Sequence, residues 1–447
     1  MTDTDVAPAV PTGTPKVPSS TRRRAWTVTA LLVVFMMINF ADKSVLGLAA
    51  EEIREDLGLS ASAFGLASSA FFLLFSISGA AVGLLADRVR PKWLILAMAV
   101  LWSVSQAPLA VGGGVAVLIA SRVLLGAAEG PAFPVAQQAT LSWFPNHRRN
   151  LPGALIVLGI TLGVLVAAPV LTWLIQNHGW RSAVAAVALV GVVWALLWLR
   201  LGGEGPYAAG AEATAPTGAG GAASEEAPAG IASEPPPRTP YRRILATRTW
   251  IGATAAYFGT YWVIAFALVW LPSYLQDALG HTSSESTQVV MTVWGLGGLA
   301  VLGQAGLTGW LLRRGAPSRW ARGGVGGVLL LVAAAACLAL PSAPAGAVTV
   351  VLLVAGFGLA GAMSSVAVTT VTELAPADRR GGALGIMNAV VTTAGLIAPT
   401  LIGRLVDAHG PDGYRYAVLI TGAVLLLSGA AALAWIDPDR DRRRLYA

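Results

Sequence analysis

Hydrophobic residues occur along this chain in long runs separated by short polar segments. Each run spans roughly 20 residues, the length that an α-helix needs to cross the ~30 Å apolar core of a bilayer. Six runs precede a long polar segment and six follow it, at 26–50, 62–86, 93–112, 115–142, 151–175 and 181–200, then at 249–275, 287–312, 322–341, 346–372, 383–405 and 414–436. The pattern predicts an all-α membrane protein with twelve transmembrane helices in two six-helix bundles.

Polar segments divide the chain into domains. Residues 1–25 are rich in Pro and Thr and end in three arginines, so we expect a disordered cytoplasmic tail rather than a cleaved signal peptide. Residues 201–248 are rich in Ala, Gly, Pro, Ser and Glu, which predicts a flexible cytoplasmic linker. The two bundles then occupy 26–200 and 249–436, and 437–447 form a second cytoplasmic tail.

Composition and charge agree with a membrane protein and indicate its orientation. The 447 residues are 55% hydrophobic and 12% charged, which is more apolar surface than a soluble fold of this size buries. With both termini in the cytoplasm, 24 of the 30 Lys and Arg residues fall in cytoplasmic segments, as is typical of membrane proteins. Topology then explains the net charge of +7 without a nucleic acid partner. We expect a multi-pass protein of the cell membrane, with the lipid bilayer as a partner.

Cysteine and histidine give no sign of metal or redox chemistry. The single cysteine, Cys337, lies inside a hydrophobic run, and the four histidines lie in predicted loops. This distribution argues against a disulfide framework, a metal cluster or a buried imidazole relay. No span or loop groups a nucleophile with a base, so we expect neither a cofactor nor an enzymatic activity.

Four charged residues lie inside predicted spans of the first half. Asp42 and Lys43 are in span 1, whereas Arg122 and Glu129 are seven residues apart in span 4 and therefore face the same way. A charge at this depth costs roughly 3 kcal/mol or more unless it is paired or hydrated, so such residues usually carry function. Buried carboxyls can bind and release protons, and buried cations can hold an anion. We expect Asp42 and Glu129 to couple protons, and Lys43 and Arg122 to bind an anionic substrate.

Alternative interpretations remain for the residues inside the spans. The four charges can form a buried salt-bridge network that only fixes helix packing and needs no substrate. Aromatic residues such as Tyr257, Tyr261 and Trp294 can line a cavity, but they can equally face lipid or another helix.

A charged loop after span 2 has a weaker copy after span 8. The first copy, Gly83-Leu-Leu-Ala-Asp87-Arg88-Val-Arg-Pro-Lys92, corresponds to Gly309–Pro317 in the second half. This repeat indicates a duplicated architecture of two bundles. A charged turn between helices more often holds a conformational gate closed than contacts a substrate, so we predict that Gly83, Asp87, Arg88 and Lys92 are gating residues.

Twelve spans in two halves, together with this loop, resemble the major facilitator superfamily. The loop matches the family signature apart from Arg90, where glycine is usual. Within the superfamily, Asn39–Ala50 and Ser121–Pro134 closely resemble the anion:cation symporters, which include permeases for galactonate, glucarate, hexuronate, phthalate and vesicular glutamate. The resemblance covers roughly 26–200 and 249–436 and leaves the linker outside.

The resemblance implies a mechanism and a set of site residues. It implies alternating access, proton coupling through Asp42 and Glu129, and carboxylate binding at Arg122 and Lys43. The position of Lys43 is commonly arginine in the family, and lysine keeps the charge but loses the two-pronged hydrogen-bonding geometry.

Departures from the family pattern bear on the substrate. Relatives that carry sugar acids tend to have tyrosine at Phe40 and Phe75 and a polar residue near Ile160, whereas this chain is apolar at all three. Unpaired substrate hydroxyls would cost about 1–3 kcal/mol each, which favours a less hydroxylated or aromatic acid. Besides Phe75, the candidate substrate contacts are Tyr261 in span 7 and three polar residues of span 11, Asn388, Thr392 and Thr393.

We therefore expect a monomeric secondary active transporter that imports a small organic anion together with protons. A proton-antiport exporter of drugs or metabolites is an alternative, although Gly159–Pro169 only partly resembles the glycine-proline signature that such exporters carry in span 5. A non-transporting membrane sensor is another, and the retained Asp42, Arg122 and Glu129 count against it. Sodium as the coupling ion and the direction of transport stay open.

Overall fold

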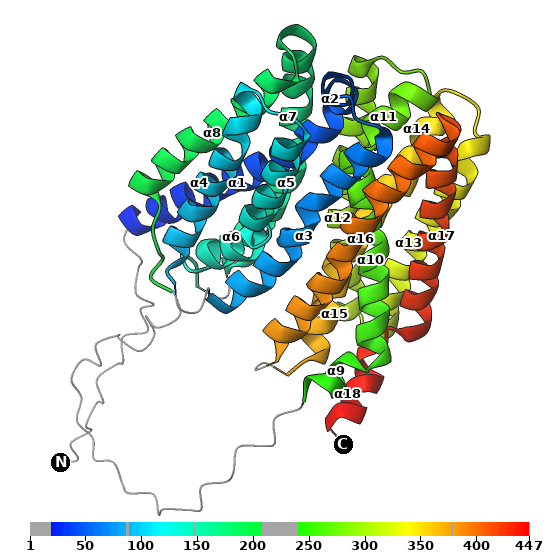
Figure 1. The fold of residues 1–447 in the computed structure, drawn as a ribbon. Coiled ribbons are helices and arrows are strands. Elements are labelled where there is room, and N and C mark those ends of the chain that lie inside the picture. Colours follow the sequence, from blue (N-terminus) through cyan, green and yellow to red (C-terminus); the bar gives the residue numbers. More distant parts are fainter. Residues whose placement is uncertain (1–18, 86–88, 146–147, 208–239, 377–378, 447) are drawn as a thin grey trace, which may run out of the picture.

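The structure of this chain is built from helices. The computed structural model describes residues 19–85, 89–145, 148–207, 240–376 and 379–446, and in these ranges every regular element is helical. Twelve segments are long and apolar enough to cross a membrane. The two halves of the chain form bundles that lie side by side, coloured blue to green and green to red in Figure 1. The predicted membrane fold of two six-helix bundles is therefore confirmed.

The first bundle follows the predicted hydrophobic runs. Span 4 is interrupted at Gly130 and Pro131, because proline lacks the N–H that would continue the helical hydrogen bonds. The helices are α1 (Ser19–Leu48), α2 (Ala50–Leu57), α3 (Ala61–Leu85), α4 (Pro91–Val111), α5 (Val115–Glu129), α6 (Ala132–Leu141), α7 (Asn150–His178) and α8 (Trp180–Leu201).

The second bundle repeats this layout with a differently interrupted span 10. There a π-helical turn, Val354–Gly358, and a 3-10 turn, Leu359–Ala362, separate two α-helices in a glycine-rich stretch. The helices are α9 (Tyr241–Leu245), α10 (Arg248–Val269), α11 (Leu271–Ser273), α12 (Ser283–Arg313), α13 (Val325–Ala339), α14 (Ala347–Leu353), α15 (Met363–Leu374), α16 (Arg380–His409), α17 (Asp412–Trp435) and α18 (Pro438–Tyr446).

Helical structure extends into segments that the sequence assigned to tails and linker. Helix α1 begins at Ser19 rather than near residue 26. The Arg24 guanidinium lies 5.6 Å from the ring centroid of Trp143, and this contact holds the start of α1 against the end of span 4. Within 201–248, the backbone N–H of Tyr207 donates to Ser142 O at 2.9 Å, and residues 241–245 form α9. Most of the expected linker, 208–239, lies outside the described residues.

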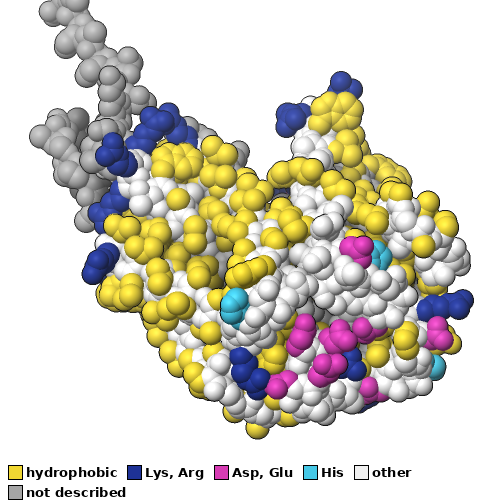
Figure 2. All heavy atoms as spheres, turned by 90° about the horizontal axis from the view of Figure 1, so that it is seen from above, with side chains coloured by type: hydrophobic (Ala, Val, Ile, Leu, Met, Phe, Trp, Pro, Cys, Tyr) yellow, Lys and Arg dark blue, Asp and Glu magenta, His cyan; other side chains and the backbone are white. Residues whose placement is uncertain are grey.

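The two ends of the bundle carry opposite charge. Helix α1 begins and α18 ends at the same end, which we call the terminal face, and both helices are rich in arginine there. The other end, the opposite face, is seen in Figure 2 and gathers acidic side chains. Burial and the neighbouring carboxylates of Asp277 and Glu55 raise the pKa of Glu51 at this face. An even number of spans places both described ends of the chain on one side.

The halves are joined at the opposite face and diverge toward the terminal face. The Asp407 carboxylate of α16 accepts hydrogen bonds from the backbone N–H groups of Ala61 and Ser62 at the start of α3, both at 2.8 Å. Closer to mid-height, Ser76 Oγ donates to Ala389 O at 3.3 Å. Among the described residues, no hydrogen bond between the halves lies nearer to the terminal face than those of Ser76. Figure 1 shows the ribbons of the two bundles spreading apart at that face.

We predict that Asp407→Ala opens the opposite face more often. The substitution removes two hydrogen bonds to a charged acceptor, each worth about 1.5–3 kcal/mol, and both must break for α3 and α16 to separate. The measurement is labelling by a membrane-impermeant maleimide of Ala168→Cys, a buried site between the halves, in a Cys337→Ser background. Labelling from the opposite face should rise at least tenfold.

Asp412→Ala is the matched control, because Asp412 is an exposed carboxylate on the same face at the start of α17. Equal labelling of the Asp407 and Asp412 variants would show that the Asp407 contact does not hold the face closed.

Candidate functional site

The candidate site begins with two adjacent residues of α1 that point to different neighbours. Consecutive side chains on a helix are separated by about 100°, so Asp42 and Lys43 diverge. Asp42 is fully buried against α4, whereas Lys43 reaches the end of α5. The site is thus assembled between three helices of the first bundle.

Lys43 forms an ion pair with Glu129. Its ammonium donates to Glu129 Oε2 and, at 2.6 Å, to Oδ1 of Asn39, one turn earlier in α1. The side chain of Glu129 is 0% exposed and that of Lys43 is 10% exposed, so the pair is almost completely withdrawn from solvent. The second carboxylate oxygen of Glu129, Oε1, has no hydrogen-bond partner. The sequence indicated buried charges here, and the structure shows which two are joined.

Phenylalanine rings enclose the Lys43 ammonium. Its Nζ lies 4.9 Å from the ring centroid of Phe40, 5.4 Å from that of Phe71 and 5.7 Å from that of Phe75. Ring faces attract a cation, so these contacts replace part of the lost hydration. Sequence reasoning selected Phe40 and Phe75 as positions without a hydroxyl, but it did not find Phe71 or the shared contact with Lys43.

Two glycines of span 4 bring these rings to the ion pair. A Cβ at Gly126 would lie 1.9 Å from Phe71 O, and a Cβ at Gly130 would lie 2.1 Å from Phe75 O. Only glycine lets the backbones of α3 and span 4 approach this closely. The Phe71 and Phe75 side chains are therefore placed beside Glu129 by the spacing of these glycines.

Asp42 has a partner that the sequence analysis missed. The Gln106 side chain of α4 donates from Nε2 to Asp42 Oδ1 at 2.8 Å, and both residues are 0% exposed. The sequence contained a signal for it, because Gln106 is the only amide side chain in the hydrophobic run 93–112. An amide in such a run usually has a specific buried partner.

Arg122 is a buried cation without a bonded partner in the described structure. Its residue is 3% exposed, its Nε has no hydrogen-bond partner, and it forms no ion pair with a described residue. It shares α5 with Glu129, but only Glu129 pairs with Lys43. A buried guanidinium usually pairs with a carboxylate, so Arg122 is suited to accept one from a ligand.

Polar residues of α16 face the first bundle. Thr392 is fully buried and donates to Ser76 Oγ at 2.7 Å, so in this state it joins the two halves. Asn388 is half-buried and its side chain forms no hydrogen bond with a described residue, and its Nδ2 lies 3.6 Å from the position of a Cβ on Gly79. Asn388 thus keeps free hydrogen-bonding groups, and both residues stay predictions as substrate contacts.

Aromatic side chains from both bundles border the cluster. Phe72 of α3 lies 6.3 Å from Tyr261 of α10, which in turn lies 5.7 Å from Tyr257, measured between ring centroids. Phe40 lies 6.1 Å from Trp294 of α12. Tyr261 is therefore an inter-bundle contact near the predicted site rather than a lipid-facing residue.

The predicted gating residues are only partly described. Asp87 and Arg88 lie outside the described residues, and Gly83 is near the end of α3. Lys92 is the second residue of α4, where its Nζ lies 5.7 Å from the ring centroid of Trp93 and its backbone oxygen accepts from Trp198 at 2.9 Å. These contacts stay within the first bundle, so gating by this loop remains a prediction.

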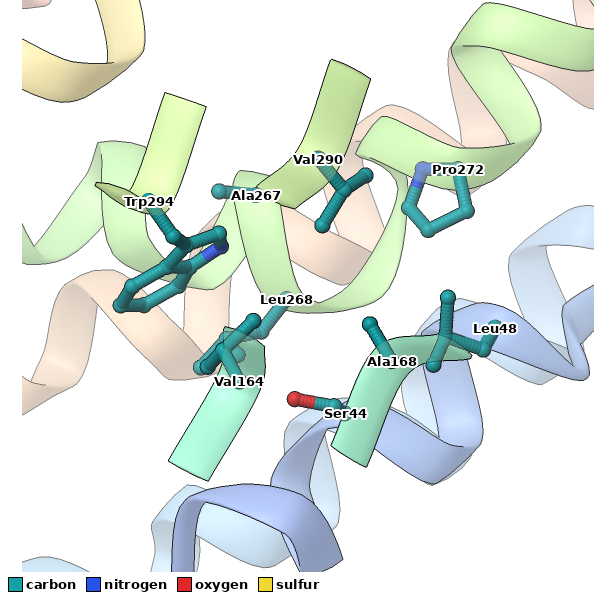
Figure 3. A pocket seen from close by; sticks show the side chains of 9 residues that line it. All are labelled: Ser44, Leu48, Val164, Ala168, Ala267, Leu268, Pro272, Val290 and Trp294. Carbon is teal, nitrogen blue, oxygen red and sulfur yellow. The ribbon is translucent and has the colours of Figure 1, made fainter. Parts of the chain in front are cut away.

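A small cavity remains between residues of the two halves (Figure 3). Ser44 and Leu48, which line it, follow Lys43 along α1 toward the opposite face. The volume of the cavity is about 10 Å³, roughly the space of one water molecule. It is lined by Ser44, Leu48, Val164, Ala168, Ala267, Leu268, Pro272, Val290 and Trp294. This cavity is too small to hold an organic carboxylate.

The chemistry of the cluster is that of ion exchange. It combines two buried carboxylates, one paired cation and one unpaired cation, with aromatic walls. In the described part of the chain, no three His, Cys, Asp or Glu side chains come together as a metal site requires. The arrangement can bind an anion and exchange protons.

Comparisons with known proteins extend over almost the whole chain. The hexuronate transporter of Bacillus subtilis is 27% identical over 91% of this chain and 94% of its own. The D-galactonate transporter of Escherichia coli is 24% identical over 95% of this chain and 97% of its own. A probable sulfoacetate transporter of Cupriavidus necator is 27% identical over 92% and 93%.

Solved structures share the fold. A bacterial homologue of the human lysosomal transporter Spinster, in an inward-facing and unoccupied conformation, matches with a TM-score of 0.72 and 17% identity over 94% of this chain and 98% of its own. A D-xylose-proton symporter matches with a TM-score of 0.70 and 16% identity over 93% and 98%. The model of the Major Facilitator Superfamily matches residues 32–370 and 325–445. The resemblance seen in the sequence is confirmed, and this chain belongs to the Major Facilitator Superfamily.

Proposed function

We propose that this protein imports an organic carboxylate together with protons by alternating access across the cell membrane. The observation that carries the proposal is the buried ion pair of Lys43 with Glu129 beside the unpaired Arg122. A cation that neutralises a proton-binding carboxylate cannot also bind a substrate anion with full strength. Proton binding and substrate binding are therefore linked through Lys43.

The coupling follows from charge balance in a site of low polarity. When Glu129 takes up a proton it loses its charge, and the Lys43 ammonium becomes available to a second carboxylate. The carboxylate of a substrate held by Arg122 and Lys43 then replaces the negative charge that Glu129 has lost. When Glu129 releases its proton, its carboxylate regains Lys43 and displaces the substrate. Asp42 supplies a second buried carboxyl next to this pair.

The orientation indicates which step of the proposed import cycle the structure represents. Arginines concentrate at the terminal face, which is the side expected in the cytoplasm. The contacts of Asp407 close the opposite face, which supports assigning this structure to the state that would release substrate inside. The Lys43 pair with Glu129 is then the arrangement left after release, with the carboxylate of Glu129 in the place of the substrate.

The relatives and the aromatic walls together suggest the substrate class. The relatives are named as transporters of hexuronate, galactonate and sulfoacetate, all of which are organic acids. Phe40 and Phe75 offer no hydroxyl to a polyhydroxylated sugar acid. A carboxylate with few hydroxyls or an aromatic ring matches these walls better.

We predict that Glu129→Gln abolishes proton-driven accumulation but keeps counterflow exchange. Glutamine stands for the protonated form, so Lys43 stays available to the substrate although no proton is carried. The measurement is uptake of a radiolabelled carboxylate into proteoliposomes with and without a pH gradient. Glu373→Gln is the control, because Glu373 pairs with Arg322 at 3.0 Å in the second bundle. Full accumulation by the Glu129 variant would contradict the coupling role.

We also predict that Arg122→Ala abolishes substrate binding. The loss of the unpaired guanidinium removes charge-assisted hydrogen bonds and should weaken affinity at least a hundredfold, and Arg122→Lys should recover only part of it. Thermal shifts of the purified protein across a panel of carboxylates measure binding without transport. The control is Arg181→Ala, whose arginine pairs with Asp56 at the opposite face. Unchanged ligand stabilisation in the Arg122 variant would refute the assignment.

The substrate preference is testable in the same panel. We expect aromatic or weakly hydroxylated acids to stabilise the protein more than galactonate or glucarate. Phe75→Tyr should shift the preference toward the sugar acids about tenfold, since one regained hydroxyl pairing is worth about 1–3 kcal/mol. Phe133→Tyr, at an exposed ring, is the control. Strong galactonate or glucarate transport without aromatic acid transport would exclude the proposed class.

A further inference from the structure

Gln106 is a buried polar residue beside the site to which the proposed coupling assigns no role. It lies on α4, it is fully buried, and its Nε2 is 2.8 Å from Oδ1 of Asp42. No other hydrogen bond to the Asp42 side chain occurs among the described residues. Whatever protonation state Asp42 adopts, Gln106 is its direct neighbour.

Two acceptor atoms of this pair are buried without a donor. They are Oε1 of Gln106 and Oδ2 of Asp42. A buried acceptor that lacks a donor costs about 1–3 kcal/mol. The pair therefore leaves room for one additional hydrogen, and a proton on the Asp42 carboxyl supplies it.

We propose that Gln106 is a positioning residue that keeps the Asp42 carboxyl hydrogen-bonded both with and without its proton. An amide carries a donor and an acceptor of nearly the same shape. The ionised carboxylate accepts from Nε2, as in the structure. After the carboxyl gains a proton, a half-turn of the amide presents Oε1, which accepts from the new O–H. This inference rests on the proposed proton coupling and adds one residue to it.

Gln106 is the group that hydrogen-bonds Asp42, because the charged residues around Asp42 do not form a hydrogen bond with it in the described structure. Lys43 and Glu129 are bonded to each other, and Arg122 forms no ion pair with a described residue. Of the other helices packed against α1, α6 and α11 carry no charged residue, and α7, α8 and α10 carry theirs only near their ends, at His178, Arg181, Arg200 and Arg248. Helix α2 carries five, Glu51, Glu52, Arg54, Glu55 and Asp56, but it follows the end of α1 at the opposite face. The tyrosines of α10 lie in the aromatic border described above.

The test replaces Gln106 by methionine, which has a similar shape but no N–H donor. Methionine removes the hydrogen bonds of both protonation states, but the bond to the ionised carboxylate is the stronger because its acceptor is charged. The protonated form of Asp42 should therefore persist to higher pH, and the midpoint of the pH profile of uptake should rise by about one pH unit. Gln106→Glu offers a donor and an acceptor while it is protonated, so it should restore uptake at acidic pH and lose it as pH rises. Counterflow exchange at saturating substrate should stay within about twofold of the unsubstituted protein in Gln106→Met.

Gln304→Met is the matched control, because Gln304 is a buried glutamine of α12 that bonds only neutral hydroxyls, those of Thr308 and Ser365. It should leave the midpoint unchanged. If Gln106→Met lowers uptake equally at every pH and lowers exchange to the same extent, Gln106 only packs the helices, and the proposal is overturned.

The same experiment separates this inference from the proposed function. If uptake by the unsubstituted protein does not depend on a pH gradient and Asp42→Asn leaves it unaltered, proton coupling itself is wrong. If the unsubstituted protein is coupled and Asp42→Asn uncouples it, while Gln106→Met keeps the original midpoint, only the role of Gln106 is wrong.

Discussion

The ion pair of Lys43 with Glu129 is the interaction on which the rest of the account depends. Each charge alone would be costly inside an apolar membrane helix, and together they neutralise each other with both side chains almost fully buried. The pair is also exchangeable, because a proton can replace the cation at Glu129 and an anion can replace the carboxylate at Lys43. The same contact that stabilises the empty site therefore links proton binding to substrate binding.

The surrounding fold maintains this pair and controls access to it. Glycines in span 4 let α3 approach closely, which brings Phe71 and Phe75 against the Lys43 ammonium. Contacts between α3 and α16 close the opposite face and leave the halves apart toward the terminal face. Helix packing thus determines both the polarity of the site and the side from which it is reached.

The sequence predicted the parts of this arrangement that depend on local pattern. The length of the hydrophobic runs gave the twelve spans, and the cost of a charge within a span singled out Asp42, Lys43, Arg122 and Glu129. Pairing was not predictable, because the rotation of α1 against α5 decides whether Lys43 meets Glu129. The enclosure by Phe71 was missed for the same reason, since it comes from the approach of a third helix.

Differences at the ends of elements also have physical causes. Helix α1 begins at Ser19 because its first turns pack on the end of span 4, where Trp26 lies 5.2 Å from Phe144, and hydrophobicity alone does not report such a contact. Gln106 was visible as an amide in an apolar run, but its role needed the position of Asp42. The sequence pattern therefore predicted the helices and the buried charged residues, whereas helix packing determined which side chains contact one another.

The central claim is that one bound carboxylate and protons move together. It is tested most directly by a pH-sensitive dye trapped inside proteoliposomes, with the membrane potential held at zero and a saturating transported carboxylate added outside. The account predicts saturable acidification of the lumen that protein-free liposomes do not show. Accumulation of labelled substrate without any change in internal pH would contradict it.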